Sequence, residues 1–356
     1  MAAESRSNPS IAISACRIST SARLHGSTSN GKRARYCAVM NGALALLVAV
    51  SPALLSAQPY PTRPLRLVVG FAPGGANDIV GRIVAQRLSE DIGQQIVVDN
   101  RPGADGGIAD VMVAKSSPDG YTLLLVPASF SYNTALQRNP PFDPKRDFSA
   151  ISLVATAPSV LLASPSFPVS SIAELVTIAK AKPGQLAYAH GGVGNLTHLA
   201  GELFKKMANI NLNAIPYRGT GPALVDLIGG QVPLQMAAIL STVPYVASGK
   251  VRGLGVTSAK RSQVMPNVPT IAEAGVPGYE AVGWWAIVAP RGLPPDILTS
   301  LNRAIGAALA APDVREKLLR QGAEPGATTP EALVAHIDRE SKKWTKVLID
   351  AHIELK

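Results

Sequence analysis

A glycine-rich segment, FAPGGAND at residues 71–78, lies between an apolar run and a helical pattern. Gly74 and Gly75 permit positive φ and leave the backbone uncovered by side chains. Asn77 or Asp78 is suited to cap the helix that follows. Exposed N–H groups at the positive end of a helix dipole suit an anionic group such as a carboxylate. A plain strand-to-helix turn uses the same residue types, so this segment alone leaves both interpretations open.

A second segment, HGGVGNLTHLAGELF at residues 190–204, has the same form. Gly192 and Gly194 resemble the opening of a dinucleotide-binding fingerprint, but Thr197 stands where the third glycine belongs. The predicted strand ending at Ile215 is followed by Pro-Tyr instead of an acidic residue, so we expect no nicotinamide cofactor. Two glycine-rich helix starts instead favour one ligand held from both sides.

Catalytic and metal-binding motifs are absent from the sequence. It contains no Gly-x-Ser-x-Gly elbow, no phosphate-binding Gly-x4-Gly-Lys motif and no His-Glu-x-x-His. His198 has no carboxylate or cysteine partners at metal spacing, which favours a structural or hydrogen-bonding role. Asp78 has two open roles, facing a ligand amine or capping its helix. Trp284 and Trp285 lie in an apolar run and are expected in the core. We therefore expect no enzyme activity, no cofactor and no metal.

Short apolar runs alternate with helical patterns along most of the chain, which predicts an α/β fold with parallel strands buried on both faces. Strands are expected at residues 65–71, 95–100, 121–126, 186–189, 212–215, 234–238, 252–256 and, as an apolar segment, 281–288. Helices are expected from about residue 79 to 92 and at residues 171–181, 196–208, 222–228, 295–310, 313–321 and 330–350. Ser170 is placed to cap the helix at 171–181, with Glu174 positioned for a capping box against Ser171.

The apolar segment at residues 148–164 is too long for an ordinary strand and has Pro158 in its middle. A strand that leaves one sheet and enters another would have this pattern, and the strand at 252–257 is suited to return. Two crossover strands predict two hinged lobes with a ligand between them. We expect residues 58–156 plus 257–356 in lobe 1 and residues 157–256 in lobe 2.

Residues 1–57 are predicted to be a secretory signal with cleavage after Ala57. A basic start, Lys32 to Arg35, precedes an apolar stretch at 38–55; Pro52 argues against a membrane anchor. Both cysteines of the chain lie in this segment, so the exported protein would carry no disulfide. It also holds six of the 34 basic and one of the 24 acidic residues, so net charge falls from +10 to +5. This modest charge, without a basic run, gives no case for nucleic-acid binding.

Several blocks together resemble the solute-binding proteins of tripartite tricarboxylate transporters, known as the Bordetella uptake gene or Bug family. They are YPTRPLRLVVGFAPGGANDIVGRIVAQRL, VVDNRPGADGGIA, SPDGYTLLL, GGVGNLTHLAGELF, IPYRGTGPALVDLIGGQVPLQM and PNVPTIAEAGVPGYEAVGWWAIVAPRGLP, in order from about residue 60. The resemblance implies a monomeric periplasmic protein of the two-lobed type II binding-protein fold (Venus flytrap), with two mixed or parallel sheets flanked by helices. It implies no enzymatic activity, capture of a small organic acid, either a carboxylate or an acidic amino acid, and delivery to membrane permease subunits where these exist.

In that family, the loop matching residues 71–78 contacts the ligand carboxylate, partly through water, and loops matching 129–133 and 192–198 complete the cleft. Asn195 replaces a serine that is common in relatives, so ligand identity is not carried over. The expected ligand-binding residues are Phe71, Pro73, Gly74, Gly75, Asn77, Asp78, Ser129, Asn133, Gly192, Asn195, Thr197, His198 and Tyr217. None of the three loops contains Arg or Lys, so we expect backbone amides, helix dipoles and water to hold the carboxylate.

Two other functions fit parts of the sequence. A sensor that passes ligand binding to a signalling partner would share the same fold and cleft, and its genomic neighbourhood would distinguish it from a transport protein. A secreted α/β enzyme with a cofactor in the glycine-rich loops would require a complete fingerprint or a nucleophile and base, which the sequence lacks.

Overall fold

In the computed structural model, which describes residues 60–135, 137 and 139–353, three parallel strands begin the fold. β1 (Leu65–Val69) pairs in parallel with both β2 (Ile96–Asn100) and β3 (Thr122–Pro127). The connecting helix α2 (Ala76–Ile92) buries one apolar side and ends at Gly93, which adopts the left-handed conformation. The predicted β-α-β unit is confirmed. The predicted signal peptide and both cysteines lie outside the described residues.

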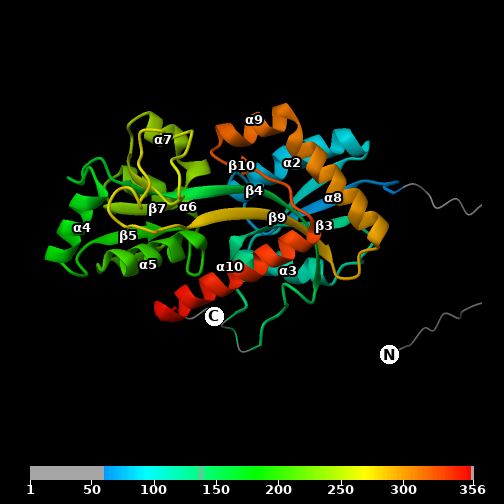
Figure 1. Cartoon of the computed structure of the whole chain (residues 1–356), viewed down its shortest axis with the longest axis horizontal. Helices are drawn as coiled ribbons and strands as arrows, with labels where there is room; N and C mark the ends of the chain where they lie inside the picture. The colour runs from blue at the N-terminus through cyan, green and yellow to red at the C-terminus, as the bar shows by residue number, and fades with distance from the viewer. Residues whose placement is uncertain (1–59, 136, 138, 354–356) are drawn as a thin grey trace, which may run out of the picture. The chain divides into compact units, whose positions relative to one another are not determined.

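A 16-residue strand, β4 (Phe148–Ala163), runs through the middle of the sheet (Figure 1). Its residues 148–158 pair with β9 (Val282–Pro290), and its residues 159–163 pair with β7 (Leu234–Ala238). Pro158 is the last residue paired with β9, and Ser159 is the first paired with β7. The strand order is β2-β1-β3-β9-β4-β7-β5-β6, in which β5 is Ala187–His190 and β6 is Asn213–Pro216. The long segment therefore does change partners at its proline, as its sequence predicted.

The predicted return strand requires a correction. β8 (Arg252–Val256) pairs with residues 160–163 of β4 and not with its first part, beside which β9 runs. Thr257 follows β8, and its hydroxyl accepts a hydrogen bond from the Ser159 amide and donates one to the Ala281 carbonyl. The lobe boundaries near these residues stay a prediction.

The strands β5 (Ala187–His190) and β6 (Asn213–Pro216) extend the sheet beyond β7, in parallel. Helix α4 (Ile172–Ala181) leads from β4 to β5, α5 (Leu196–Ala208) connects β5 to β6, and α6 (Thr220–Ile228) leads from β6 to β7. Ser171, not Ser170, caps α4, because its hydroxyl is placed to accept from the Glu174 amide. The Glu174 carboxylate instead accepts from the Ser170 amide, one residue further out than predicted.

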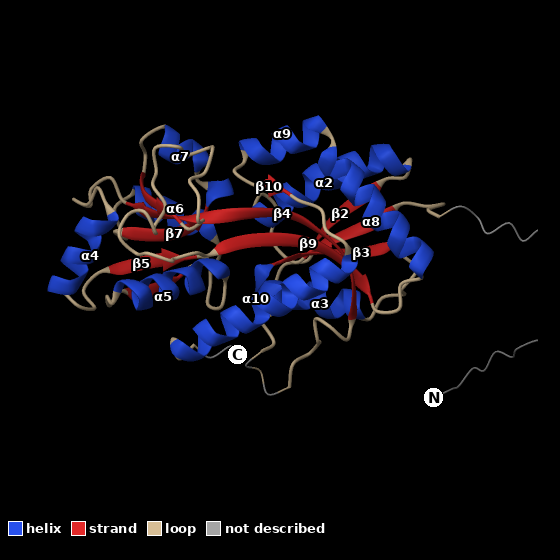
Figure 2. Ribbon diagram, in the orientation of Figure 1, coloured by secondary structure: helices blue, strands red, loops and turns tan. Residues whose placement is uncertain are grey.

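Helices cover both faces of the sheet, as Figure 2 shows. Successive side chains of a strand point to opposite faces of the sheet, so an apolar strand has two faces to bury. In β1, Leu67 and Val69 belong to one buried cluster and Val68 to another on the opposite face. The predicted C-terminal helices are α8 (Pro295–Ala310), α9 (Pro312–Arg320) and α10 (Pro330–Asp350). Three further elements were not predicted from the sequence: α3 (Gly107–Ala114), α7 (Val243–Ala247) and the two-residue β10 (Glu324–Pro325). Among the described residues, no helix is both long and apolar enough to cross a membrane.

Candidate functional site

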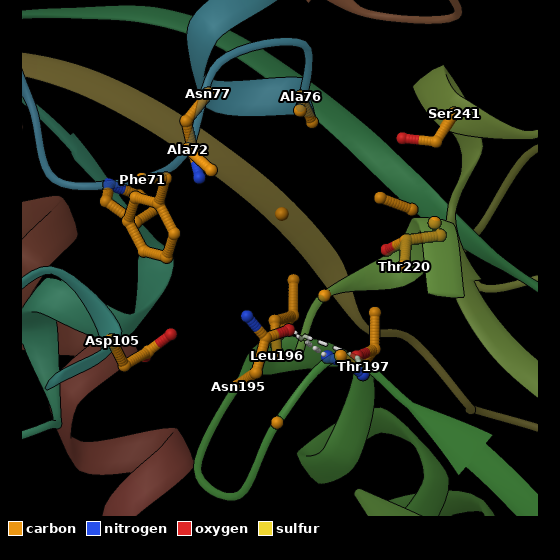
Figure 3. Close-up of a pocket in the computed structure, with 18 of the residues that line it drawn as sticks. Phe71, Ala72, Ala76, Asn77, Asp105, Asn195, Leu196, Thr197, Thr220 and Ser241 are labelled. Carbon is orange, nitrogen blue, oxygen red and sulfur yellow. Dashed lines mark hydrogen bonds between the residues drawn. The ribbon is translucent and has the colours of Figure 1, made fainter. Parts of the chain in front are cut away.

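A cavity of about 1100 Å³ lies where loops at the carboxyl ends of the parallel strands converge (Figure 3). These loops follow β1, β2, β3, β5 and β6, together with the segment after β7. Parallel strands direct their carboxyl ends to the same edge, which is the usual ligand position in open α/β sheets. Nine of the thirteen predicted residues line this cavity: Phe71, Pro73, Gly74, Gly75, Asn77, Ser129, Gly192, Asn195 and Thr197. Their contact with a ligand stays a prediction.

The helix α2 presents uncapped amides at the cavity. Gly75 occupies its N-cap position in extended conformation, and no side chain there accepts a hydrogen bond. Within the described part of the chain, the amides of Ala76, Asn77 and Asp78 make no hydrogen bond. The first-turn N–H groups and the helix dipole therefore create an anion-binding position beside the cavity.

Asn77 adds a side-chain donor to this position. Its Oδ1 accepts a hydrogen bond from Nε1 of Trp285 on β9. Because an indole N–H only donates, this bond requires the amide oxygen to face Trp285 and leaves the NH₂ group for the cavity. Trp284 and Trp285 are buried, as predicted, yet both also line the cavity.

Asp78 is outside the cavity lining and organises the loop from behind. Its carboxylate accepts from the Gly74 amide at 2.9 Å, from Arg82 Nε at 2.9 Å and from Asn100 Nδ2 at 3.0 Å. Burial acts to raise the pKa of Asp78, but these hydrogen bonds and the Arg82 charge outweigh it and lower the pKa. The carboxylate therefore stays ionised and holds Gly74 at φ 80°.

Across the cavity, Asn195 caps α5. Its Oδ1 accepts from the Thr197 amide at 3.0 Å and from the Thr197 hydroxyl at 3.1 Å. The Thr197 hydroxyl in turn accepts from the Gly191 amide at 2.9 Å. These bonds occupy the Asn195 oxygen and leave its NH₂ group available at the cavity (Figure 3).

Two histidines support this loop from beneath. The rings of His190 and His198 stack with centroids 4.2 Å apart. His190 Nδ1 lies 2.9 Å from the Gly192 carbonyl oxygen, to which it donates in the tautomer with the proton on Nδ1, and His198 Nδ1 accepts from the Gly194 amide at 3.3 Å. Burial lowers the pKa of His190 to about 3 and that of His198 to about 4, so both rings are neutral. Neither His198 nor Tyr217 lines the cavity. The described residues contain no group of three side chains able to bind a metal ion.

Sequence reasoning missed the loop after β2. Asp105 lines the cavity, and its backbone has φ 48° and ψ 40° between Gly103 and Gly106. Asn133, a predicted ligand-binding residue, is not in the lining but donates to Asp105 Oδ2 at 3.1 Å. The glycines in the RPGADGG segment were the available signal for a third special loop.

The loop after β6 and the helix α6 complete the lining and were also missed. Arg218 contributes an exposed guanidinium, which forms no ion pair within the described residues. Apolar side chains cover the adjoining surface: Pro222, Leu224, Val225, Ile228, Ala238 and Tyr245. The cavity thus has a polar side, formed by the glycine-rich loops, and an apolar side around α6.

Comparisons with known proteins agree with this architecture. Residues 80–353 match the TctC model, described as tripartite tricarboxylate transporter family receptor. The protein BugT of Bordetella pertussis is 38% identical over 304 residues, which cover 85% of this chain and 93% of BugT.

Two solved structures are similar over their whole length. R. palustris Rpa4515 with adipate has a TM-score of 0.79 and 40% identity, covering 83% of this chain and 99% of that one. MatC from Rhodopseudomonas palustris with bound malate has a TM-score of 0.74 and 33% identity, covering 81% of this chain and 100% of that one. The resemblance found in the sequence is confirmed, as is the periplasmic-binding-protein fold. The chain therefore belongs to the family of tripartite tricarboxylate transporter receptors, with BugT among its relatives.

Proposed function

We propose that this chain is a periplasmic solute-binding protein that captures a small organic acid in the cavity and delivers it to a tripartite tricarboxylate-type permease. The observation that carries the proposal is the uncapped start of α2. Three first-turn amides without partners, together with the Asn77 NH₂ group, offer several hydrogen-bond donors to one anion.

The ligand is expected to span the two sides of the cavity. Its carboxylate accepts from α2, while the Asn195 NH₂ group donates from the opposite loop. Apolar atoms of the ligand pack on Leu224, Tyr245 and Trp285. Adipate and malate in the two similar structures are carboxylates, which supports this class of ligand.

No enzymatic step is part of the proposal. The buried histidines are neutral and bonded to backbone groups of the loop, so they stabilise the site. We further propose export with cleavage after Ala57, two lobes that close around the ligand, and a monomeric protein. Mass spectrometry of the exported chain tests the cleavage site, with Gln58 as the expected first residue.

Thermal unfolding of residues 58–356, stripped of bound ligand, tests the function. The panel contains mono-, di- and tricarboxylates, acidic amino acids and aromatic acids, with uncharged amides of the same acids as controls. A ligand at about 100 times its Kd stabilises the folded state by about 2.7 kcal/mol and raises the melting temperature. Stabilisation by acids and not by their amides supports the proposal; no shift with any acid, in protein shown to be folded, contradicts it.

A further inference from the structure

The cavity contains one carboxylate among groups that donate hydrogen bonds. Asp105 directs its side chain into the cavity, facing the side where Asn195 lies (Figure 3). The α2 amides and the NH₂ groups of Asn77 and Asn195 all favour an anion. A second negative charge in the same cavity repels that anion unless the ligand also brings a positive group.

The fold fixes the position of Asp105 beside the anion-binding loop. A methyl group added at Gly106 would come within 3.2 Å of Phe71 Cε2, and one added at Gly70 within 2.7 Å of Gly106 Cα. Asn133 Nδ2 also donates to the Asp105 carbonyl at 3.3 Å and to Oδ2 at 3.1 Å. These contacts hold Asp105 next to the β1–α2 loop, so one small molecule can reach both.

No protein cation pairs with Asp105 among the described residues: Arg218 also lines the cavity but forms no ion pair with it. Within the same part of the chain, the one hydrogen-bonded side-chain partner of Asp105 within 3.5 Å is the neutral amide of Asn133. Burial raises the pKa of Asp105, while the polar side chains of Asn133, Ser129 and Asn195 act in the opposite direction. The ionised form therefore lacks a cation, and a charged ligand group would supply it.

We propose that Asp105 binds a protonated amine of the ligand, so that the preferred ligands are amino acids carrying a carboxylate for α2 and an ammonium group for Asp105. This inference rests on the proposed function and narrows its substrate class. It assigns to Asp105 the amine recognition that the sequence left open for Asp78, whose carboxylate is occupied by Gly74, Arg82 and Asn100.

Calorimetry with matched acids tests the inference. Each set shares a carbon skeleton and differs at one position: aspartate, malate and succinate; glutamate and glutarate; phenylalanine and 3-phenylpropionate. In the wild-type protein, the amino member of at least one set should bind ten times or more tighter than its amine-free partner. Asp105→Asn should weaken the amino acid at least tenfold and strengthen the amine-free acid, because the repulsion is removed. Asparagine is chosen because it tolerates positive φ.

Asp119→Asn is the matched control. Asp119 is a partly exposed carboxylate paired with Arg63 and does not line the cavity, so its variant should leave the ratio of affinities unchanged. Circular dichroism establishes that each variant is folded.

Three results overturn the inference. Amine-free acids that bind as tightly as amino acids, with the ratio unchanged in Asp105→Asn, exclude recognition of an amine while the proposed function stands. The affinity for acids without an amine could increase as pH falls in the wild type but not in Asp105→Asn. This result would identify Asp105 as a protonated hydrogen-bond donor instead of an amine-binding carboxylate. Failure of every acid to bind folded, ligand-free protein contradicts the proposed function itself.

Discussion

Trp285 on β9 donates its indole N–H to the side-chain oxygen of Asn77 in the first turn of α2, joining residues 208 positions apart. The bond connects the sheet to the helix terminus that we propose as the carboxylate site. It also sets the orientation of the Asn77 amide, because the indole nitrogen cannot accept a hydrogen bond.

Trp285→Phe should therefore weaken carboxylate binding by about three- to tenfold, since a typical hydrogen bond contributes about 0.5–1.5 kcal/mol. Calorimetry with the tightest acid of the panel measures the change. Trp344→Phe is the control, because Trp344 does not line the cavity and its indole donates to Glu340 at 2.8 Å. Equal loss of affinity in the two variants would contradict a specific role for the Asn77 orientation.

Gly75→Asp should abolish carboxylate binding while leaving the fold intact. A methyl group at Gly75 meets only the Ala72 carbonyl oxygen, at 3.6 Å, and the backbone φ of −82° suits any residue. Aspartate at an N-cap accepts from first-turn amides and, relative to glycine, stabilises a helix by about a few tenths of a kcal/mol. The new carboxylate would thus occupy the donors that the ligand needs and repel its charge.

Gly75→Ala is the companion variant, which adds a side chain without charge and should retain most of the affinity. Affinity near the wild-type value in Gly75→Asp would refute the α2 carboxylate site. Thermal unfolding of both variants shows whether any loss comes from misfolding.

Asp105→Asn should raise the melting temperature of the ligand-free protein at neutral pH. Because burial raises the pKa of Asp105, the folded state holds the proton more tightly than the unfolded state, whose pKa is about 3.9. Stability then falls as pH rises from the unfolded pKa through the folded one. Asp105→Asn has no carboxyl group at this position and therefore lacks this loss of stability. Its melting temperature should exceed that of the wild type at pH 7 and differ little from it at pH 3. A lower melting temperature at pH 7 would contradict the prediction.

The stacked histidines should make the protein sensitive to acid. Their folded pKa values of about 3 and about 4 lie below the ordinary value of 6.5, so the unfolded state binds protons first. Stability is fully present above pH 6.5 and decreases as pH falls toward 4, by up to about 1.4 kcal/mol per pH unit for each histidine.

His198→Asn should reduce this slope because it removes one titrating ring while offering an oxygen to the Gly194 amide. Denaturant unfolding between pH 4 and 7 measures it. His352→Asn is the control, because His352 is exposed and has a φ of 53° that asparagine tolerates. An unchanged slope in His198→Asn would show that other groups determine the acid sensitivity.

Arg218→Gln should weaken dicarboxylates more than monocarboxylates. The guanidinium is exposed at the cavity, so its attraction for a second carboxylate is modest, about two- to fivefold, and decreases with salt. Calorimetry at low and high salt measures both effects. Lys250→Gln, an exposed residue outside the cavity lining, should change neither. An equal loss of affinity for mono- and dicarboxylates would show that Arg218 does not bind a second carboxylate.

The regular elements of the fold were predictable because each is determined by local patterns. Continuous apolar runs gave the buried parallel strands, and the helices beside them followed from their 3.6-residue period. The short helices α3 and α7 were missed, since eight and five residues provide too few turns for that period to show. The cap of α4 was misplaced by one residue because two serines stand together and only the backbone decides which one caps.

The glycine-rich loops were visible in the sequence because glycine and helix-capping residues are local signals. The sequence by itself thus determined the strands, the helices between them and two loops suited to an anion. Only the tertiary structure decided which side chains join those loops. Asp105, Arg218 and Trp285 come from separate segments and reach one cavity because parallel strands end at a common edge and β9 inserts beside β4. Such convergence depends on strand order, which no local pattern encodes.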